Sequence, residues 1–272
     1  MGVGERIRRM GIIDDRMALH ILDDEQFRKR FGKGRERPRT TKAWNATDSE
    51  ETYRRNLLDP KRKRWLEELG WHDASIRYRY NNHGFRCDVD FQRAGIPQGN
   101  MFIGCSITEG VALNIEDTWC HIMGSRLGGP IYNLGQGATG IDCQYRVLRA
   151  WGPYLRPRRI FTLGAFGYRR EIMRDDGIIE PIGPWSTASA LDMLVRFYGN
   201  DASRDMHMNL CLDAMKRVCH DNGIELWAAG DGIRGWCSGH EETDRGRDLI
   251  HMGCKFHASV GRSEMDQWHR LA

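Results

Sequence analysis

The sequence predicts an α/β fold with a mainly parallel sheet. Four short apolar segments are typical of buried strands, and they span 101–103, 131–134, 159–164 and 224–230. Longer stretches with helical spacing separate them, and strands that alternate with helices pair in parallel through right-handed crossovers. The chain has 272 residues, 40% of them hydrophobic, which is enough for one sizeable core.

Glycine and proline mark the expected ends of the helices between these strands. The first helix should stop before Gly128-Gly129-Pro130 and the next before Gly152-Pro153. The region 165–184 is aromatic, basic and rich in glycine and proline, so we expect a loop that shapes a substrate pocket. The expected helices span 115–127, 142–151, 187–198, 203–222 and 254–268.

The first 87 residues differ in composition, and we expect them to form a basic extension packed on a catalytic domain at 88–272. Helical spacing covers 14–32, with acids at its start and bases at its end. Basic runs follow at 33–42 and 59–65, the second leading into a short helix. No recognised nucleic-acid-binding motif accompanies these runs, so solvated charge is the simpler interpretation and we expect no nucleic-acid partner.

A strand is expected near the end of this extension. Ile76, Tyr78 and Tyr80 alternate with arginines, which is the pattern of a half-buried strand. Asn81-Asn82-His83-Gly84 is typical of a turn, so the segment predicts a strand, a turn and a return strand. We interpret His83 as a turn residue rather than part of an active-site rim.

Ser106 is the candidate nucleophile. It stands in Gly104-x-Ser106-x-x-x-Gly110, directly after the first apolar segment. A serine there lies at the carboxyl end of a strand, where open α/β sheets keep their active sites, and the glycines permit a tight turn. The competing interpretation is an ordinary turn serine. The neighbouring Cys105 is expected to pack beneath the strand.

An acid and a histidine near the C-terminus strengthen the case for Ser106. Asp248 precedes His251 by three residues, so its carboxylate can hold the imidazole in one tautomer while the other nitrogen faces a nucleophile. The loop before them offers other candidates for the acid, and Asp248 is preferred for its spacing to His251. These competitors are Asp231, His240, Glu241, Glu242 and Asp244. His257, further along, is expected to be structural.

Three segments in this order resemble the first, second and last blocks of the SGNH (GDSL-like) hydrolases: GCSITEG, NLGQG and DLIH, at 104–110, 133–137 and 248–251. The resemblance covers roughly 100–262. It implies a three-layer α/β/α sandwich with a flavodoxin-like sheet, and ester hydrolysis by Ser106. The motif N-x-x-G-F-R at 81–86 looks like one that precedes the catalytic domain in some phage-associated and environmental members.

Two departures from the family pattern stand out. Cys105 replaces the usual aspartate beside the nucleophile, and the Gly-x-Asn-Asp block is missing where Gly164-Ala165-Phe166-Gly167 stands. A literal Gly-Asn-Asp occurs at 199–201, but it follows a helix rather than a strand. There, glycine is expected to end one helix and Asn and Asp to begin the next, so we reject it as catalytic.

Without the family's asparagine, the oxyanion must find other donors. Backbone amides of the nucleophile turn and of the second-block loop are the first candidates, and they belong to Ser106, Gly135, Gly137 and Ala138. Side chains after the third strand are the second set, serving either the oxyanion or an anionic substrate group. These are Tyr168, Arg169 and Arg170.

Cofactors and metals have no signal in the sequence. The eight cysteines contain no C-x-x-C motif, and histidines and cysteines nowhere fall at zinc-ligand spacing, so we expect free thiols, no metal and no cofactor. No apolar run approaches the roughly 18 residues of a membrane span, and the first residues lack a secretory signal. We expect a soluble, cytoplasmic protein, and a virus-associated setting fits the resemblance.

The leading functional hypothesis is therefore a serine esterase that acts on a small acyl ester, such as an O-acetyl group on a glycan. Two alternatives stay open at this point. One is an SGNH-like acyltransferase, which uses the same acyl-enzyme but excludes water. The other is a catalytically weak module of the same fold that binds a glycan or an anion. The sequence leaves the acyl group, the alcohol and the oligomeric state undefined.

Overall fold

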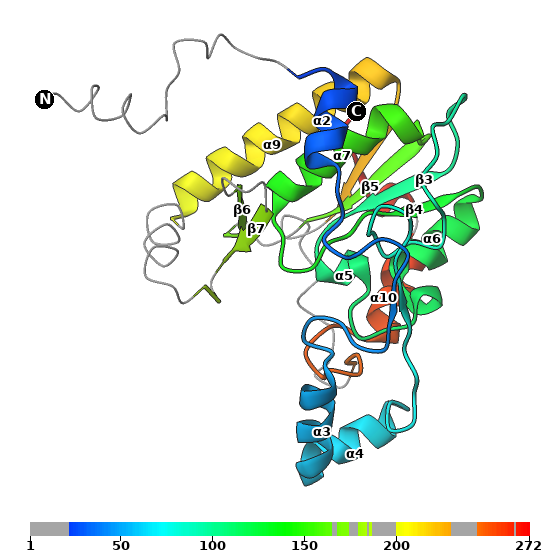
Figure 1. Cartoon of the computed structure of the whole chain (residues 1–272), viewed down its shortest axis with the longest axis vertical. Coiled ribbons are helices and arrows are strands. Elements are labelled where there is room, and N and C mark those ends of the chain that lie inside the picture. The colour runs from blue at the N-terminus through cyan, green and yellow to red at the C-terminus, as the bar shows by residue number, and fades with distance from the viewer. Residues whose placement is uncertain are drawn as a thin grey trace, which may run out of the picture.

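A five-stranded sheet lies at the centre of the computed structural model (Figure 1). The structure describes residues 22–164, 168–173, 179–183, 185–186, 200–229, 244–263 and 265–272. The strand order is β4-β3-β5-β8-β9. Its strands are β3 (Asn100–Ile103), β4 (Ile131–Asn133), β5 (Arg159–Leu163), β8 (Glu225–Ala229) and β9 (His269–Arg270).

The first four of these strands pair in parallel, and β9 pairs antiparallel with β8. If the four parallel strands are numbered 1 to 4 along the chain, their order across the sheet is 2-1-3-4, which is the order of flavodoxin-like sheets. The predicted α/β fold with a mainly parallel sheet is confirmed.

Helices cover both faces of this sheet. Because side chains alternate along a strand, Met101 and Ile103 enter one core while Phe102 enters the other. The first core packs against α7 (Ile141–Leu155) and α9 (Asp201–Asn222), and the second against α6 (Trp119–Leu127) and α10 (Cys254–Arg262). α2 (Asp24–Phe31) lies on the outside of α7.

Several helix limits differ from those expected. α7 continues through Gly152 and Pro153 and ends at Leu155, with Arg156 at φ 47 as its cap. A proline so close to a helix end disturbs few backbone hydrogen bonds, and a side chain at Gly152 would approach Leu148 to 3.0 Å. Buried packing therefore outweighs the local stop signal.

The helix expected at 115–127 is also divided. A short 3-10 turn, Ile115–Asp117, precedes α6, and Thr118 separates them because its side chain accepts a hydrogen bond from the His121 amide. The expected last helix ends at Arg262, followed by the 3-10 turn Met265–Gln267 and β9. Burial of Trp268 against Trp119 and Phe161 accompanies this turn back towards the sheet.

The extension contains helices and one short strand pair. Its elements are α2, β1 (Thr41–Lys42), α3 (Glu50–Leu58), α4 (Pro60–Glu68) and β2 (Tyr78–Arg79). The expected turn at 81–84 is present, with Gly84 at φ +77, but the prediction of a return strand directly after it is wrong. β2 pairs instead with β1, from a more distant part of the extension.

The buried face predicted for this strand is confirmed. Ile76, Tyr78 and Tyr80 are all at most 2% exposed and share a core with Leu66 and Leu113. His83 packs against the Trp151 ring, with their centroids 4.5 Å apart, and burial lowers its pKa. It is a packed turn residue, as expected.

The region 165–184 was expected to be irregular, but its described part contains an antiparallel hairpin. Its strands are β6 (Arg170–Met173) and β7 (Ile179–Ile182). The helix expected at 187–198 lies outside the described residues. Asn200 begins α9 as its cap, accepting from the Ser203 amide, which agrees with the rejection of this asparagine as catalytic. Within the described ranges, no helix is long and apolar enough to cross a membrane.

Candidate active site

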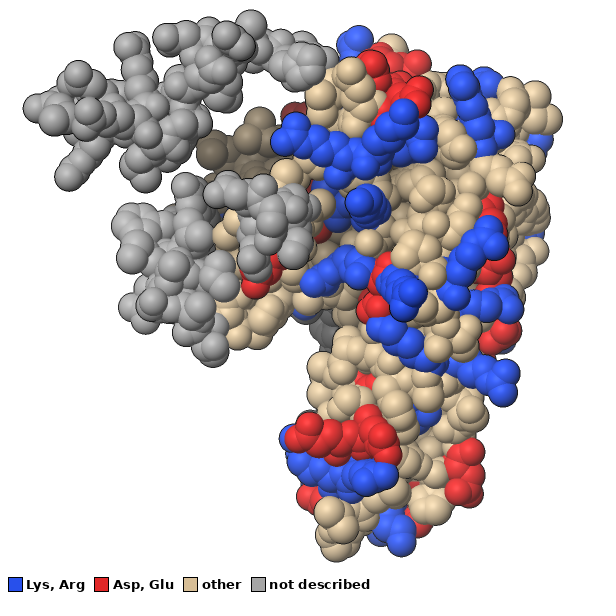
Figure 2. All heavy atoms as spheres, viewed as in Figure 1, with Lys and Arg blue, Asp and Glu red and all other residues tan. Residues whose placement is uncertain are grey.

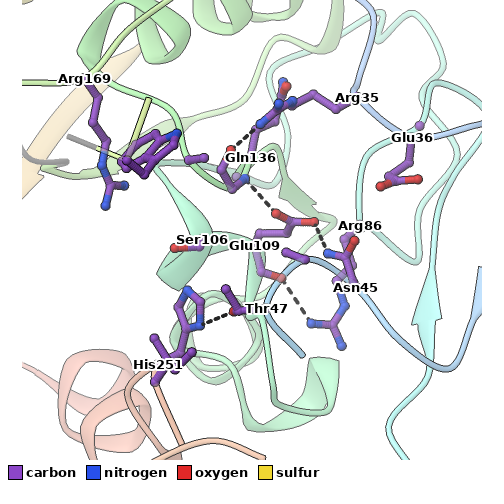
Figure 3. A pocket seen from close by; sticks show the side chains of 17 residues that line it. Arg35, Glu36, Asn45, Thr47, Arg86, Ser106, Glu109, Gln136, Arg169 and His251 are labelled. Carbon is purple, nitrogen blue, oxygen red and sulfur yellow. Dashed lines mark hydrogen bonds between the residues drawn. The ribbon is translucent and has the colours of Figure 1, made fainter. Parts of the chain in front are cut away.

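Ser106 opens the short helix α5 (Ser106–Glu109), immediately after β3. Only glycine fits at two positions of this turn and its neighbouring loop. A Cβ at Gly104 would lie 2.0 Å from the Thr108 hydroxyl oxygen, and one at Gly135 would lie 2.4 Å from the Glu109 nitrogen. The glycines of the first two blocks therefore let the two loops touch. Ser106 lines a pocket of about 670 Å³ at the carboxyl edge of the parallel strands, together with His251 (Figure 3).

Asp248 and His251 form a hydrogen-bonded pair. His251 Nδ1 lies 2.7 Å from Asp248 Oδ2, while Asp248 Oδ1 accepts from the amides of Ile250 and His251 at 2.9 and 3.0 Å. The Asp248 side chain is fully buried and that of His251 is 15% exposed. Since Nδ1 faces the carboxylate, Nε2 is the nitrogen left for the pocket.

The pKa of Asp248 reflects two opposing effects. Burial alone raises the pKa of this carboxyl, but the hydrogen bonds and charge of His251, with a further hydrogen bond from Thr47, outweigh it. The net pKa is below the ordinary value for aspartate. Asp248 is therefore held in its ionised form, as a group that orients an imidazole must be.

Thr47 is a member of this cluster that sequence reasoning missed. Its hydroxyl donates to Asp248 Oδ2 at 2.6 Å, and its oxygen lies 3.3 Å from His251 Nδ1. A tight turn presents it, because Asn45 and Asp48 exchange two backbone hydrogen bonds of 2.9 and 3.0 Å around Ala46 and Thr47. A threonine in a basic extension gives no local signal of such a role.

Glu109, also missed, lies beside Ser106 in the pocket wall. Its Oε2 accepts from the Gly137 amide at 2.7 Å and its Oε1 from Asn45 Nδ2 at 2.9 Å. Burial raises its pKa, against the charge of Arg86 and these hydrogen bonds. The carboxyl group thus ties the nucleophile helix, the second-block loop and the extension together. Its place three residues after the serine, inside the nucleophile motif, was the available signal.

These contacts decide which predicted amides can still receive an oxyanion. The Gly135 amide donates to Asn133 Oδ1 at 2.9 Å, and that of Gly137 donates to Glu109. Both are therefore already engaged. The amides of Ser106 and Ala138 have no acceptor in the described part of the chain. Ala138 adopts φ 59, a left-handed conformation that is uncommon outside glycine and often found at functional sites.

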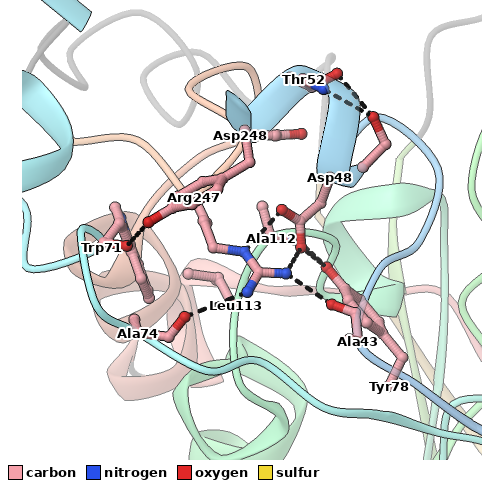
Figure 4. Close-up of polar contacts among 12 residues, drawn as sticks. Ala43, Asp48, Thr52, Trp71, Ala74, Tyr78, Ala112, Leu113, Arg247 and Asp248 are labelled. Carbon is pink, nitrogen blue, oxygen red and sulfur yellow. Dashed lines mark hydrogen bonds and ion pairs between the residues drawn. The ribbon is translucent and has the colours of Figure 1, made fainter. Parts of the chain in front are cut away.

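The segment that carries Asp248 is fixed by a buried ion pair (Figure 4). Arg247 donates from Nε and Nη2 to the two carboxylate oxygens of Asp48 at 2.9 and 2.8 Å, and both side chains are at most 4% exposed. The Arg247 guanidinium also lies 4.0 Å from the centroid of the Trp44 ring. Extension residues thus surround the residue immediately before the candidate acid.

Only one of the three side chains proposed after the third strand reaches the pocket: Arg169 lines it. Tyr168 instead donates to Asp201 Oδ1 at 2.7 Å, at the start of α9. Arg170 donates to the Arg169 carbonyl oxygen and does not line the pocket. The structure therefore directs Tyr168 and Arg170 elsewhere.

Asp244 and His257, two further candidates near the Asp248–His251 pair, have structural contacts instead. Asp244 accepts from the amides of Lys255 and Phe256 at 3.2 and 2.6 Å, so it caps α10 rather than holding His251. His257 is buried and its Nδ1 accepts from the Trp119 amide at 3.1 Å; burial lowers its pKa to about 3. Asp231, His240, Glu241, Glu242 and the 165–167 segment, with Phe166, lie outside the described residues.

The described part of the site holds neither a cluster of metal ligands nor a disulfide. Across the described ranges, no group of three or more His, Cys, Asp or Glu side chains is arranged to hold a metal ion. Cys105 is 4% exposed beneath the nucleophile turn, as expected. The seven cysteines that the structure describes are all free thiols.

Comparisons with known proteins add little to this geometry. No protein-family profile matches the chain, and no curated protein matches it. One solved structure that is similar to it is LAE5, an α/β hydrolase enzyme from the metagenome of Lake Arreo, Spain. The identity is 14% and the TM-score 0.31, with 62% of this chain and 94% of that chain covered. A TM-score this low supports no argument about function.

Proposed function

We propose that this protein is a serine-dependent carboxylic ester hydrolase of the SGNH type, acting on small acyl esters such as O-acetyl groups on a glycan. In it, Ser106 is the nucleophile, His251 the general base and Asp248 the acid that orients His251. The observation that carries the proposal is the 2.7 Å contact between the buried Asp248 and His251, which lines a pocket together with Ser106. Nucleophile, base and orienting acid are the three roles that acyl transfer by serine requires.

In the proposed reaction, Ser106 Oγ attacks the acyl carbon while His251 Nε2 accepts the hydroxyl proton. The tetrahedral intermediate collapses, the bond to the alcohol oxygen breaks, and His251 returns the proton to the leaving alcohol. Water then attacks the acyl-enzyme by the same route, releasing the acid and restoring Ser106. The ionised Asp248 stabilises the imidazolium that forms twice in this cycle.

The oxyanion hole that we propose contains the amides of Ser106 and Ala138, which have no acceptor among the described residues. Glu109 supports it by holding Gly137, next to Ala138, with a 2.7 Å hydrogen bond. One missing donor costs on the order of 2.7–4 kcal/mol in the transition state. An enzyme with two amides and no asparagine should therefore turn over more slowly than one with a complete set.

Labelling with a fluorophosphonate tests the nucleophile directly, because such reagents react with serines that an adjacent base activates. We expect one labelled peptide, containing Ser106, and no labelling of the Ser106→Ala protein.

A parallel assay with p-nitrophenyl acetate, with and without an added alcohol, separates hydrolysis from transfer. Release of acetate supports the esterase, and predominant ester transfer to the alcohol supports the acyltransferase. Absence of both reactions and of labelling contradicts the proposal and favours the binding module.

A further inference from the structure

Arg35 and Arg169 reach the pocket from separate parts of the chain and flank Ser106 in Figure 3. Arg35 is exposed, and its hydrogen bond is donated to the neutral carbonyl oxygen of Gly137. No carboxylate in the described ranges lies within ion-pair distance of its guanidinium. Arginine has five N–H donors in a planar fork that matches a carboxylate. Arg35 therefore keeps donors available for an anion.

Neither of the two acids among the described lining residues forms an ion pair with Arg35. Glu36 forms an ion pair with Lys42. Glu109 is 7% exposed and accepts from Gly137 and Asn45, and burial raises its pKa, which disfavours its charged form. Among the described lining residues there are three arginines and two acids, so their formal charge is positive. Figure 2 shows Lys and Arg side chains on the face of the molecule turned to the viewer, with Asp and Glu among them.

Trp185 supplies an apolar surface at the same pocket. It is 45% exposed and lines the pocket, although large aromatic side chains are usually more buried. Its ring packs closely on the backbone of Gly183, since a Cβ there would lie 2.5 Å from ring atom Cη2. The Arg169 guanidinium lies 5.1 Å from the centroid of the ring. A fixed, exposed indole ring offers a flat surface for the apolar face of a sugar ring.

From this combination we infer that the substrate is an acylated saccharide with an anionic group close to the ester. Trp185 packs against a sugar ring, and Arg35 binds the anionic group, while Ser106 attacks the acyl carbon. The inference rests on the proposed esterase function for the last of these three contacts. It requires no new reaction step, because the charged group selects the substrate and does not take part in the chemistry.

The test compares two α-1,4-linked oligosaccharides that differ only at C6 of each sugar: O-acetylated oligogalacturonide, with a carboxylate at C6, and the O-acetylated galacto-oligosaccharide of the same linkage, with a hydroxymethyl group there. We expect kcat/KM to be at least about tenfold higher for the anionic substrate, because only the anion can accept charge-assisted hydrogen bonds from Arg35. The preference should fall with added salt, as a partly exposed ion pair requires. Acetylated galactose 6-phosphate shows whether phosphate serves in place of carboxylate.

Two variants assign the preference to its residues. Arg35→Gln keeps a donor for Gly137 but removes the charge, so the ratio of anionic to neutral kcat/KM should fall at least fivefold. Arg37→Gln is the matched control, because Arg37 is exposed two residues away and does not line the pocket. Trp185→Ala should lower kcat/KM for both saccharides more than it lowers kcat/KM for p-nitrophenyl acetate.

Binding to the Ser106→Ala protein separates this inference from the esterase proposal. By calorimetry, unacetylated oligogalacturonide should bind at least about tenfold more tightly than galacto-oligosaccharide. Such binding without hydrolysis by the wild type would support the anionic subsite while refuting the esterase. Hydrolysis with equal kcat/KM and equal binding for both saccharides would overturn the inference and leave the esterase intact. An Arg37→Gln effect as large as that of Arg35→Gln would also overturn it.

Discussion

Residues 32–48 and residues 49–72 are neighbours in the extension, yet they meet the rest of the protein in different ways. The first segment runs along the pocket, where Arg35, Asn45 and Thr47 contact the second-block loop, Glu109 and Asp248. The second forms the α3–α4 hairpin, which projects from the body of the molecule in Figure 1. One segment thus contributes side chains to the pocket, whereas the other mostly faces solvent and meets this region through Asn56, which donates to the Asp248 carbonyl oxygen at 3.4 Å.

The α3–α4 hairpin has few buried side chains. Asn56 in α3 and Leu66 in α4 are buried, whereas Leu58 is 84% exposed. Its ion pairs, such as Arg64 with Glu68, are exposed and lie one helical turn apart. The basic run at 59–65 is therefore a solvated helix face, and the run at 33–42 supplies Arg35 to the pocket. Charge alone does not distinguish the two runs, but their hydrogen-bond partners do.

Breaking the ion pair between the first segment and the C-terminal region should have the largest effect on stability. In Asp48→Ala, Arg247 stays buried without its carboxylate, and the hydroxyl of Tyr78 loses its acceptor. We expect the free energy of unfolding to fall by about 3–5 kcal/mol, measured by urea denaturation. Asp88→Ala removes an exposed partner of Arg79 and should cost less than about 1 kcal/mol. Equal losses in the two variants would contradict a buried, structural role for Asp48.

Thr47→Val should lower kcat while leaving the fold intact. Valine has nearly the same shape but cannot donate to Asp248 Oδ2, so the Asp248–His251 pair loses one restraint. We expect kcat to fall by about tenfold or more, with little change in KM, in a p-nitrophenyl acetate assay.

The hydroxyl, rather than the bulk of the side chain, should carry this effect. Thr47→Ser should therefore recover most of the lost kcat. Thr40→Val is the matched control, because the Thr40 hydroxyl donates to the backbone carbonyl oxygen of Arg37, away from the pair. A Thr47→Ser protein as slow as Thr47→Val would show that only packing matters.

The hydrogen bond from Thr47 to Asp248 should also affect how the free energy of unfolding depends on pH. The pKa of Asp248 is lowered in the folded state, so its stabilisation is present above the ordinary aspartate pKa of about 3.9 and is lost as pH falls through the lowered value. Thr47→Val removes one cause of the lowering. Its deficit in free energy of unfolding should therefore be constant from pH 7 to pH 5 and shrink below about pH 4. A deficit that is the same at pH 3 and pH 7 would exclude an effect through Asp248.

The smallest effect is expected in the hairpin. Glu68→Ala breaks an exposed pair with Arg64 and should change the free energy of unfolding by no more than about 0.5 kcal/mol. Ester hydrolysis should stay within twofold of wild type. A large loss of activity would show that the α3–α4 hairpin takes part in function, and the contrast between the two segments would fail.

Local patterns were enough to predict much of this protein. The parallel strands follow from short apolar runs, and the contact between Asp248 and His251 follows from a motif in which they are three positions apart. The catalytic roles of Ser106, Asp248 and His251 stay a prediction. Thr47 could not be found in this way, because its partner Asp248 is 201 positions away in the chain. The engagement of the Gly135 and Gly137 amides was hidden for a similar reason, since their acceptors depend on how two loops pack.

Burial also overrode local signals in the elements that were predicted incorrectly. Gly152 and Pro153 are typical of a helix stop, but Gly152 lies on a buried face of α7 with Leu148 and Leu155, and these leucines belong to the core on this side of the sheet. β2 was expected to fold back on its own return strand, but its partner is β1. Such choices depend on which surface an element covers, and a short sequence window does not contain that information.

The central claim is that Ser106 performs nucleophilic catalysis in a pocket that His251 also lines, with Asp248 holding His251 from behind. Steady-state hydrolysis of p-nitrophenyl acetate by the wild-type and Ser106→Ala proteins tests it most directly, with circular dichroism to confirm that both are folded. The account predicts a loss of at least roughly three orders of magnitude in kcat, since only binding and oxyanion contributions remain without the nucleophile. A folded Ser106→Ala protein that keeps the wild-type rate would contradict it.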